Sequence, residues 1–313
     1  MRPASASAIL RAEVSVANPD AAKGDSGGDG GAAASISDTV RDHVRAVVGG
    51  LLVGLPLLWT QEMWRNGETM HPLKLLVLLA ASFAIVVGFN AVSGFRRDRS
   101  WFELLLDSLQ SLGLSMFIAA IVLYVLGRIE PEFGIATVVG RIALLAIPVS
   151  FGTALASSLL SDEEEGGGRE AAGPVGELFV AAGGALYFAL NIAPTDEVRL
   201  VGSEADTPLV LVAIAVSLVV GFATLLTISR AKGSRSWFGD GPLDGPVGET
   251  IAAYAIALLV SYVLLWSFDL VEGLGFRALV GHVVMLGVVA AFGAAAARIL
   301  VGDGSDARAE AAA

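Results

Sequence analysis

Eight long apolar segments constrain the fold of this chain more than any other feature. They occupy residues 46–64, 73–95, 104–127, 135–160, 175–193, 208–229, 249–271 and 277–300. A transmembrane helix needs about 20 predominantly apolar residues to cross a hydrocarbon core of about 30 Å. Because lipid offers no water to satisfy an exposed backbone, each such segment must be helical. We therefore predict an all-α polytopic membrane helix bundle with about eight transmembrane helices.

The composition supports a membrane protein and limits its chemistry. Of the 313 residues, 55% are hydrophobic and only 16% are charged, whereas a soluble domain carries about 25% charged residues. The chain has no cysteine, and its three histidines are far apart, so we expect no metal site. The net charge is −11 and no basic patch is present, so nucleic acid is not an expected partner. No nucleotide-binding or hydrolase motif occurs, and we expect no cofactor, no catalytic residue and, on balance, no enzyme.

The positions of Lys and Arg predict how the chain is oriented, because cytoplasmic loops of membrane proteins are enriched in these residues. With the N-terminus inside, ten of them fall on the inner side and five on the outer side. The inner set comprises Arg41, Arg45, Arg96, Arg97, Arg99, Arg169, Arg230, Lys232, Arg235 and Arg298. We therefore predict a multi-pass protein of the cell (plasma or inner) membrane, with both termini in the cytoplasm and the lipid bilayer as its partner.

Four short sequences recur in the same order in the two halves of the chain. "VGGLLVGLPLLW" from Val48 is similar to "VGELFVAAGGAL" from Val175, and "VVGF" occurs at 86–89 and 219–222. "RSWF" occurs at 99–102 and 235–238, and the segments from Val139 and Val280 match. The offsets rise from 127 through 133 and 136 to 141. This pattern predicts a parallel 4+4 internal repeat; the alternative is that "RSWF" only reflects interfacial preferences of Arg and Trp.

The repeat and the composition together divide the chain into five parts. We predict a disordered acidic N-terminal tail at 1–43, a first four-helix membrane repeat at 44–161, an acidic Gly-rich cytoplasmic linker at 162–174, a second four-helix repeat at 175–301, and a disordered C-terminal tail at 302–313. Segments rich in Gly, Ser and acidic residues bury too little apolar surface to fold by themselves.

The chain resembles a known family at four stretches: "PLLWTQEMW", "GFRRDRSW", "AIPVSFGTALA" and "FALNIAPTDEV". The family is a prokaryotic one of multi-pass integral membrane proteins of unknown function. The resemblance covers about residues 45 to 300. It implies a multi-pass membrane protein and no particular chemistry.

Ionisable and polar groups inside the apolar segments are the candidate site. Such groups cost roughly 2.5–3.5 kcal/mol on insertion scales and usually face a partner inside the bundle. The predicted orientation places Glu62, Arg141, His282, Asn191 and Asp269 in the outer third of the bilayer. We predict a Glu62–Arg141 ion pair, with His282 at the repeat position that corresponds to Arg141. The alternatives are that the pair is purely structural, and that Glu62, Asn191 and Asp269 simply reach the interface.

Two further residues are candidates for an inner vestibule. Asp107 lies one turn inside the third segment, and Asn90 lies at a similar level in the second. The alternative for Asp107 is an acid favoured by the helix dipole near a helix N-terminus.

The functions open to such a chain are few. We expect a transporter or channel for a small solute or ion, built on the two repeats. The alternatives are a non-catalytic sensor or assembly scaffold and, less favoured, a membrane-embedded lipid-modifying enzyme. The "GLLVG" at 50–54 and the small residues Gly287, Ala291 and Ala295 indicate close helix packing. That packing is compatible both with contacts inside the bundle and with a homodimer.

Overall fold

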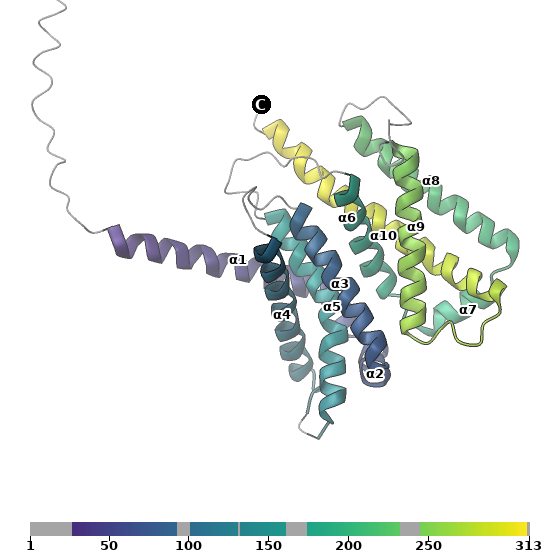
Figure 1. Cartoon of the computed structure of the whole chain (residues 1–313), viewed down its shortest axis with the longest axis horizontal. Coiled ribbons are helices and arrows are strands. Elements are labelled where there is room, and N and C mark those ends of the chain that lie inside the picture. The colour runs from purple at the N-terminus through teal and green to yellow at the C-terminus, as the bar shows by residue number, and fades with distance from the viewer. Residues whose placement is uncertain (1–26, 93–100, 131, 161–173, 232–244, 312–313) are drawn as a thin grey trace, which may run out of the picture. The chain divides into compact units, whose positions relative to one another are not determined.

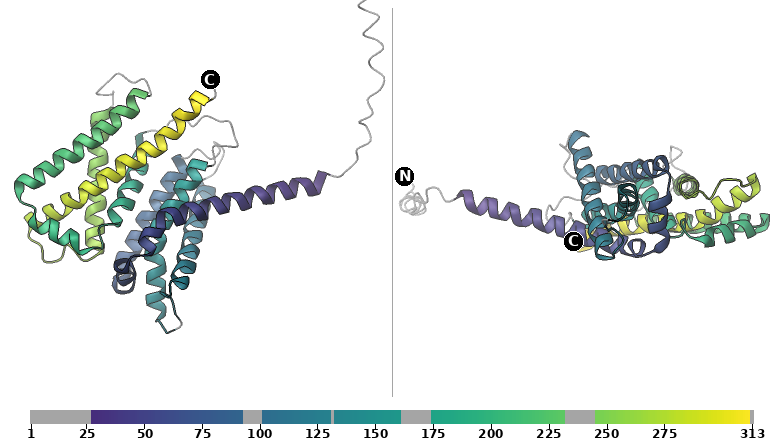
Figure 2. Two further views of the ribbon diagram at one scale, coloured as in Figure 1. Left: turned by 180° about the vertical axis from the view of Figure 1, so that it is seen from behind. Right: turned by 90° about the horizontal axis from the view of Figure 1, so that it is seen from below.

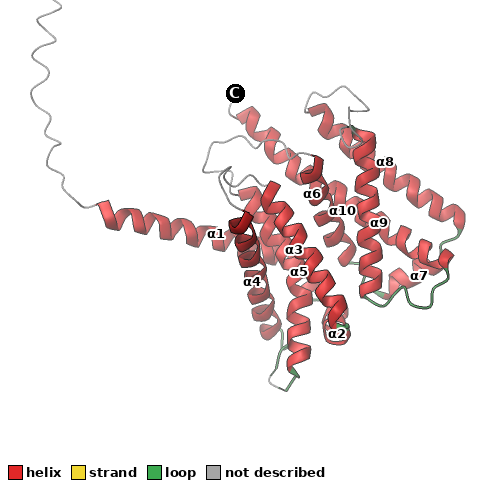
Figure 3. Cartoon of the chain, in the orientation of Figure 1, coloured by secondary structure: helices red, strands yellow, loops and turns green. Residues whose placement is uncertain are grey.

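The structure, a computed structural model, describes residues 27–92, 101–130, 132–160, 174–231 and 245–311. These described parts consist of helices and loops without strands (Figure 3). Their helices are α1 (Gly27–Leu58), α2 (Gln61–Thr69), α3 (Pro72–Val92), α4 (Trp101–Val125), α5 (Ile135–Leu160), α6 (Pro174–Leu190), α7 (Asp196–Glu204), α8 (Thr207–Ala231), α9 (Pro246–Ser267) and α10 (Phe276–Ala311).

The chain divides into two units, residues 1–43 and residues 44–313. Helix α1 already begins at Gly27 and α10 continues to Ala311. Residues 27–43 and 302–311, which the sequence places in disordered tails, are thus described as helical, and the division of the chain into tails and repeats stays a prediction.

Within the described ranges, six helices are long and apolar enough to cross a membrane: α3, α4, α5, α8, α9 and α10. The first predicted span is instead a pair of helices, His43–Leu58 and Gln61–Thr69, bent by 85°. The fifth predicted span ends early, because α6 has 17 residues and is followed by the short helix α7. An all-helical multi-pass membrane protein is thus confirmed, whereas the number of eight crossings stays a prediction.

Both breaks have the same local structure. Thr60 precedes α2 with φ −96° and ψ 133°, and Thr195 precedes α7 with φ −92° and ψ 155°. Each hydroxyl donates to the carbonyl three residues earlier, on Leu57 and Ile192 respectively. An extended residue cannot continue a helix, and the hydroxyl satisfies a carbonyl that the broken helix leaves open. Each break therefore occurs at an extended threonine. In the first pair of helices this residue is Thr60, four residues after Pro56, which lies inside α1.

Helices α5 and α10 are the centres of two similar sets of contacts. Helix α5 packs against α2, α3 and α4, whereas α10 packs against α6, α7, α8 and α9. Of the apolar window of α5, 67% is buried, against 28% for α4. Figures 1 and 2 show α3, α4 and α5 beside one another, and likewise α8, α9 and α10. Helix α6 joins the two sets, since it also contacts α3 and α5.

Glycines bring the backbones of these helices into direct contact at two corresponding places. A Cβ on Gly152 of α5 would lie 2.5 Å from the carbonyl oxygen of Gly49 in α1. A Cβ on Gly293 of α10 would lie 2.3 Å from the carbonyl oxygen of Gly184 in α6. Any side chain at these positions would push the helices apart, so glycine is required by close approach.

The short helices repeat this arrangement. A Cβ on Gly140 of α5 would lie 2.0 Å from the Gly67 carbonyl oxygen in α2. A Cβ on Gly281 of α10 would lie 2.8 Å from the Gly202 carbonyl oxygen in α7. The contacting glycines of α1 and α2 precede those of α6 and α7 by 135 residues (202 − 67). Those of α5 precede those of α10 by 141 residues (281 − 140).

The helix packing gives a different register from the sequence at two of the four recurring motifs. It aligns Gly49 with Gly184, an offset of 135, where the sequence pairing of Val48 with Val175 had 127. In α3 and α8 the buried serines Ser82 and Ser217 also differ by 135, against 133 for the "VVGF" motifs. The offset of 141 agrees with the packing. The second "RSWF", at 235–238, lies outside the described residues.

The glycine contacts predict a measurable asymmetry between two glycine substitutions. Gly140→Ala should lower the melting temperature of the detergent-purified protein, because its methyl group would overlap the Gly67 carbonyl. Overpacking of this kind lowers the free energy of unfolding by about 1–3 kcal/mol. Gly113→Ala in α4 is the control, since a Cβ there meets nothing within 4 Å. Gly113→Ala should be neutral or stabilising, by up to about 1 kcal/mol. Equal melting temperatures for the two variants would contradict this packing.

Candidate functional site

Arg141 is buried in α5 and pairs with a carboxylate on the short helix α2. Its Nη2 donates to Glu68 Oε2 at 2.6 Å, and its Nη1 donates to the Arg128 carbonyl at 2.7 Å. The guanidinium also lies 4.7 Å from the ring centre of Phe133. The Arg141 side chain is 10% exposed and that of Glu68 is 46% exposed. Hydrogen bonds and an opposite charge thus offset the cost of burying this arginine.

The predicted Glu62–Arg141 pair is wrong, because the partner of Arg141 is Glu68. Glu62 is exposed, and its backbone carbonyl accepts a hydrogen bond from Asn66. Six residues of α-helix rotate a side chain by about 600°, which places Glu62 and Glu68 on different faces of α2. The signal that points to Glu68 is its neighbour Gly67, which lets α5 approach α2 at this level.

His282 occupies in α10 the place that Arg141 occupies in α5. It is 2% exposed, and its Nδ1 lies 2.8 Å from the Ala278 carbonyl oxygen. A Cβ on Gly202 of α7 would lie 2.5 Å from its ring. The residue after Gly202 is Ser203, where α2 has Glu68. The correspondence of the two positions agrees with the sequence offset of 141, but His282 packs against a glycine and not against a carboxylate.

Asp269 and Asn191 have separate contacts of their own. Asp269 forms an ion pair with Lys74 of α3, and Glu272 lies 3.6 Å from the same ammonium group. Asp269 has a φ of +60° at the end of α9, a left-handed conformation that Asp tolerates better than most residues. The Asn191 amide donates to the Tyr187 carbonyl. Within the described residues, no hydrogen bond or ion pair joins any two of the five outer candidates.

The two inner candidates lie at the junction of α3 and α4. The Asn90 amide donates to Ser108 Oγ at 2.9 Å, and Ser108 follows Asp107 in the chain. Asp107 is half-buried, and its backbone carbonyl accepts from Ser111.

A buried charged cluster that the sequence did not reveal joins α6, α9 and α10. Arg298 Nη2 donates to Glu177 and to Glu249, the latter at 2.8 Å. The Arg298 side chain is 5% exposed and each carboxylate side chain is 20% exposed. Sequence reasoning counted Arg298 only as one of the inner basic residues. The missed signal is that these three residues end or begin three different apolar segments on the same predicted side.

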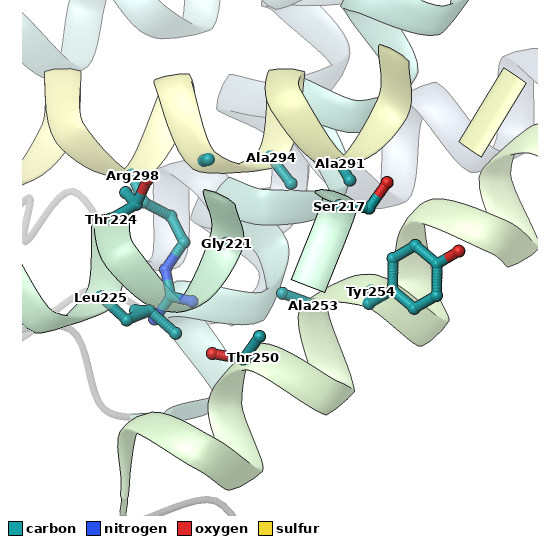
Figure 4. Close-up of a pocket in the computed structure, with 11 residues that line it drawn as sticks. Ser217, Gly221, Thr224, Leu225, Thr250, Ala253, Tyr254, Ala291, Ala294 and Arg298 are labelled. Atoms are coloured by element: carbon teal, nitrogen blue, oxygen red, sulfur yellow. The ribbon is translucent and has the colours of Figure 1, made fainter. Parts of the chain in front are cut away.

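Arg298 also lines a small cavity between α8, α9 and α10 (Figure 4). The cavity volume is about 20 Å³, enough for one water-sized molecule. Figure 4 shows the Arg298 side chain extending from α10 toward Thr250. The residues that line the cavity are Ser217, Gly221, Thr224, Leu225, Thr250, Ala253, Tyr254, Ala291, Ala294, Ala295 and Arg298.

The polar groups of this cavity keep part of their hydrogen-bonding capacity. The hydroxyls of Ser217, Thr224 and Thr250 each donate to the carbonyl four residues earlier on their own helix. The hydroxyls of Ser217 and Thr250 therefore retain acceptor lone pairs. The Tyr254 hydroxyl is buried without a hydrogen-bond partner among the described residues. Arg298 uses only Nη2 in its recorded bonds to described residues, so Nη1 and Nε remain as donors.

The corresponding region of α3, α4 and α5 is filled. Val86 and Phe89, each 2% exposed or less, stand at the positions that correspond by 135 residues to Gly221 and Thr224. In α5, Ser150 stands where α10 has Ala291, and it forms a hydrogen bond of 3.0 Å with Ser82.

A second pair of hydrogen-bonded hydroxyls fills this region one turn further along α5. Thr153 stands where α10 has Ala294, and it forms a hydrogen bond of 3.3 Å with Ser115 of α4. Smaller residues at the corresponding positions of α8 and α10 therefore open the cavity.

Long apolar helices, close glycine contacts and buried ion pairs at their ends together define a polytopic α-helical integral membrane protein. The particular family follows from the sequence, because the model of the family described as "Putative integral membrane protein (DUF2391)" matches residues 42–301. The chain therefore belongs to this family of integral membrane proteins. No curated protein and no solved structure matches it.

The outer ion pair predicts a specific coupling between two variants. Glu68→Gln and Arg141→Gln should each lower the melting temperature, and their combination should be less destabilising than the sum, because the first change already removes the charge partner. Loss of one member of a buried pair costs about 3–5 kcal/mol, and the partial exposure of Glu68 places this pair below that range. Glu62→Gln is the control, since Glu62 is exposed. A Glu62→Gln variant that couples to Arg141→Gln while Glu68→Gln does not would contradict the assignment.

Proposed function

We propose that this protein transports a small polar solute or ion across the membrane, with the cavity between α8, α9 and α10 as its binding site. The observation that carries the proposal is the guanidinium of Arg298, which is buried between apolar helices and keeps donors beside a cavity. A charge in a membrane segment is costly, and such residues are by default taken as candidates for a functional site.

The position of the cavity along the helices supports this role. Ser217 lies ten residues after the start of α8 at Thr207, which is roughly 15 Å at about 1.5 Å per residue. That distance is near the middle of a hydrocarbon core of about 30 Å. Arg298 lies near the last residues of the α10 span, Phe276–Leu300. The polar lining thus extends from mid-membrane toward one surface, which is the cytoplasmic one if both termini are inside the cell.

The chemistry of the lining favours a solute that both donates and accepts hydrogen bonds. Arg298 and the Tyr254 hydroxyl supply donors, while Ser217 and Thr250 supply acceptor lone pairs. The volume of about 20 Å³ limits the occupant to one small molecule or ion at a time.

The two corresponding sets of helices support a duplication as the origin of this arrangement. In our proposal, residues 44–161 and 175–301 are parallel copies of one four-helix unit, each with a broken first helix. Parallel repeats related by an axis along the membrane normal occur in known transporters. One copy then keeps a filled, structural interior, while the other carries the site.

Two other functions fit the geometry less well. A membrane-embedded enzyme needs convergent acids, and Glu177 and Glu249 do converge, but both are bound to Arg298. That ion pairing opposes their use as a free acid and base. A scaffold would need the buried charges for packing alone, and it gives no reason for the unpartnered Tyr254 hydroxyl.

Filling the cavity tests the proposal. Gly221→Val introduces the residue that stands at the corresponding position, Val86, and a Cβ at Gly221 would be 3.5 Å from its nearest neighbour in Thr250. The variant should therefore fold. Proteoliposomes would be assayed for uptake of sodium, rubidium, chloride and urea tracers; the native protein should accelerate at least one above protein-free vesicles, and Gly221→Val should reduce that rate at least tenfold.

The control is Gly113→Val, which adds the same side chain at an exposed position of α4 with open space around it. It should keep the native rate. If the native protein accelerates none of the four probes, or if Gly221→Val transports at the native rate, the transport proposal is wrong and a packing role for Arg298 is favoured.

A further inference from the structure

Inside the chain, α6 docks on α3 and α5 through a stripe of three residues spaced by four. The ring of Phe179 lies against Gly88 of α3, where a Cβ would be 2.2 Å from the ring. A Cβ on Gly183 would lie 2.6 Å from the ring of Phe151 in α5, and Tyr187 stacks on that ring with centroids 5.4 Å apart. This stripe is how the second set of helices binds the first.

Helix α1 carries a stripe at the corresponding positions, and that stripe is uncovered. Subtracting 135 from Phe179, Gly183 and Tyr187 gives 44, 48 and 52, which are Val44, Val48 and Leu52. Their exposures are 55%, 58% and 77%. The opposite face of α1 is occupied, since Gly49 and Gly54 contact α5. The helix that corresponds to α6 therefore has the same docking stripe with nothing on it among the described residues.

The surface that would receive such a stripe is also uncovered. Gly88 and Phe151 correspond by 135 and 141 residues to Ala223 of α8 and Phe292 of α10. Ala223 is exposed, and Phe292 is 39% exposed, whereas Phe151 is 8% exposed beneath α6. The α8–α10 face thus repeats the α3–α5 face without a helix over it.

We propose that α1 of one copy of this chain docks on the α8–α10 face of a second copy, in the way that α6 docks on α3 and α5 within a chain. The occupant of the face is therefore this protein itself. The inference is independent of transport, since it rests on the two uncovered faces and on the proposed correspondence of the two halves of the chain.

The side-chain volumes at the two faces compensate for one another. Where the internal contact has the large Phe179 against Gly88, the proposed contact has the smaller Val44 against Ala223. Close packing requires such opposite changes, because interiors tolerate neither overlap nor voids. A surface covered only by fluid lipid chains would need no compensation of this kind.

The second contact site shows compensation at one of its two neighbours. Gly183 contacts Phe151 and Phe89 in the internal interface. The corresponding proposed contact has the larger Val48 against Phe292, which is unchanged, and against the smaller Thr224.

The contact joins different faces of the two copies, so it is heterologous and closes into a ring when the rotation between units allows. All units share one orientation in the membrane if the halves are parallel copies, as a ring requires. Thr224 belongs both to the proposed docking face and to the cavity lining. The docked α1 would therefore lie beside the cavity of its partner.

A disulfide between two copies tests the contact, and the chain has no native cysteine to interfere. A Cβ on Gly88 would lie 2.3 Å from Cγ of Phe179, so the two Cβ atoms are at most about 4 Å apart, a separation suited to a disulfide. The corresponding pair is Val44→Cys and Ala223→Cys. Copies with different tags, each carrying one of these changes, would be co-expressed and oxidised in native membranes; a cross-linked dimer carrying both tags is expected.

Three controls make the result decisive. Gly88→Cys with Phe179→Cys in one chain should form an internal disulfide, which proves the oxidation conditions. Val44→Cys paired with Phe117→Cys, an exposed residue of α4 (63% exposed), should give at most one tenth of the cross-linked product. Each single-cysteine variant alone should stay uncross-linked.

The proposal is overturned if the internal control oxidises while Val44→Cys and Ala223→Cys copies give no dimer, which means that lipid covers both faces. It is equally overturned if Phe117→Cys cross-links as efficiently as Ala223→Cys, which means that collisions and not docking produce the bond.

Discussion

The direct contact of helix backbones at glycines is the constraint on which the rest of this structure depends. In lipid, apolar side chains gain little by leaving one apolar surface for another, so helices associate through close packing and polar contacts. Helices α5 and α10 meet this requirement at Gly140, Gly152, Gly281 and Gly293. Each of these contacts fixes the depth and rotation of a central helix, and the neighbouring helices arrange around it. The ion pairs then form at the ends of helices that are already in register.

The buried charges have different roles because they lie in different surroundings. Arg141 donates from its two terminal nitrogens to Glu68 and a backbone carbonyl, next to the ring of Phe133, and only its buried Nε has no hydrogen-bond partner among the described residues. Arg298 is held by two carboxylates on one nitrogen and faces a cavity with the others. The first arrangement fixes α2 on α5. The second leaves hydrogen-bonding capacity beside a cavity, which is why we propose a solute path there.

The two halves of the chain have similar helix contacts but differ in the side chains that fill the space between those helices. At the same helix positions, one half has Val86 and the hydroxyl pair of Ser82 with Ser150, and the other has Gly221 and Ala291. A filled interior in one half supplies rigidity, and an open interior in the other supplies space. The outer faces differ in the same way, since α6 covers the α3–α5 face and none of the described helices covers the corresponding α8–α10 face.

The sequence by itself determined the class of the protein and most of its helices, because spans of about 20 apolar residues in lipid have only one conformation available. It also predicted an internal repeat, although the register of that repeat differs from the helix packing at Val48 and at "VVGF", since apolar residues in membrane helices are too similar to define an alignment. The sequence did not predict which carboxylate pairs with Arg141. Choosing Glu68 over Glu62 required the break at Thr60, which rotates and tilts α2 relative to α1.

Only the tertiary structure decided that Arg298, Glu177 and Glu249 meet. These residues are separated by 49 and 121 positions in the chain, and each taken alone fits an ordinary interfacial charge. The cavity beside them likewise depends on which faces of α8, α9 and α10 point inward, a rotation that weakly amphipathic membrane helices do not encode. Length and hydropathy are one-dimensional properties and can be read along a chain. Contacts between helices depend on their rotation and depth, which packing at a few glycines fixes.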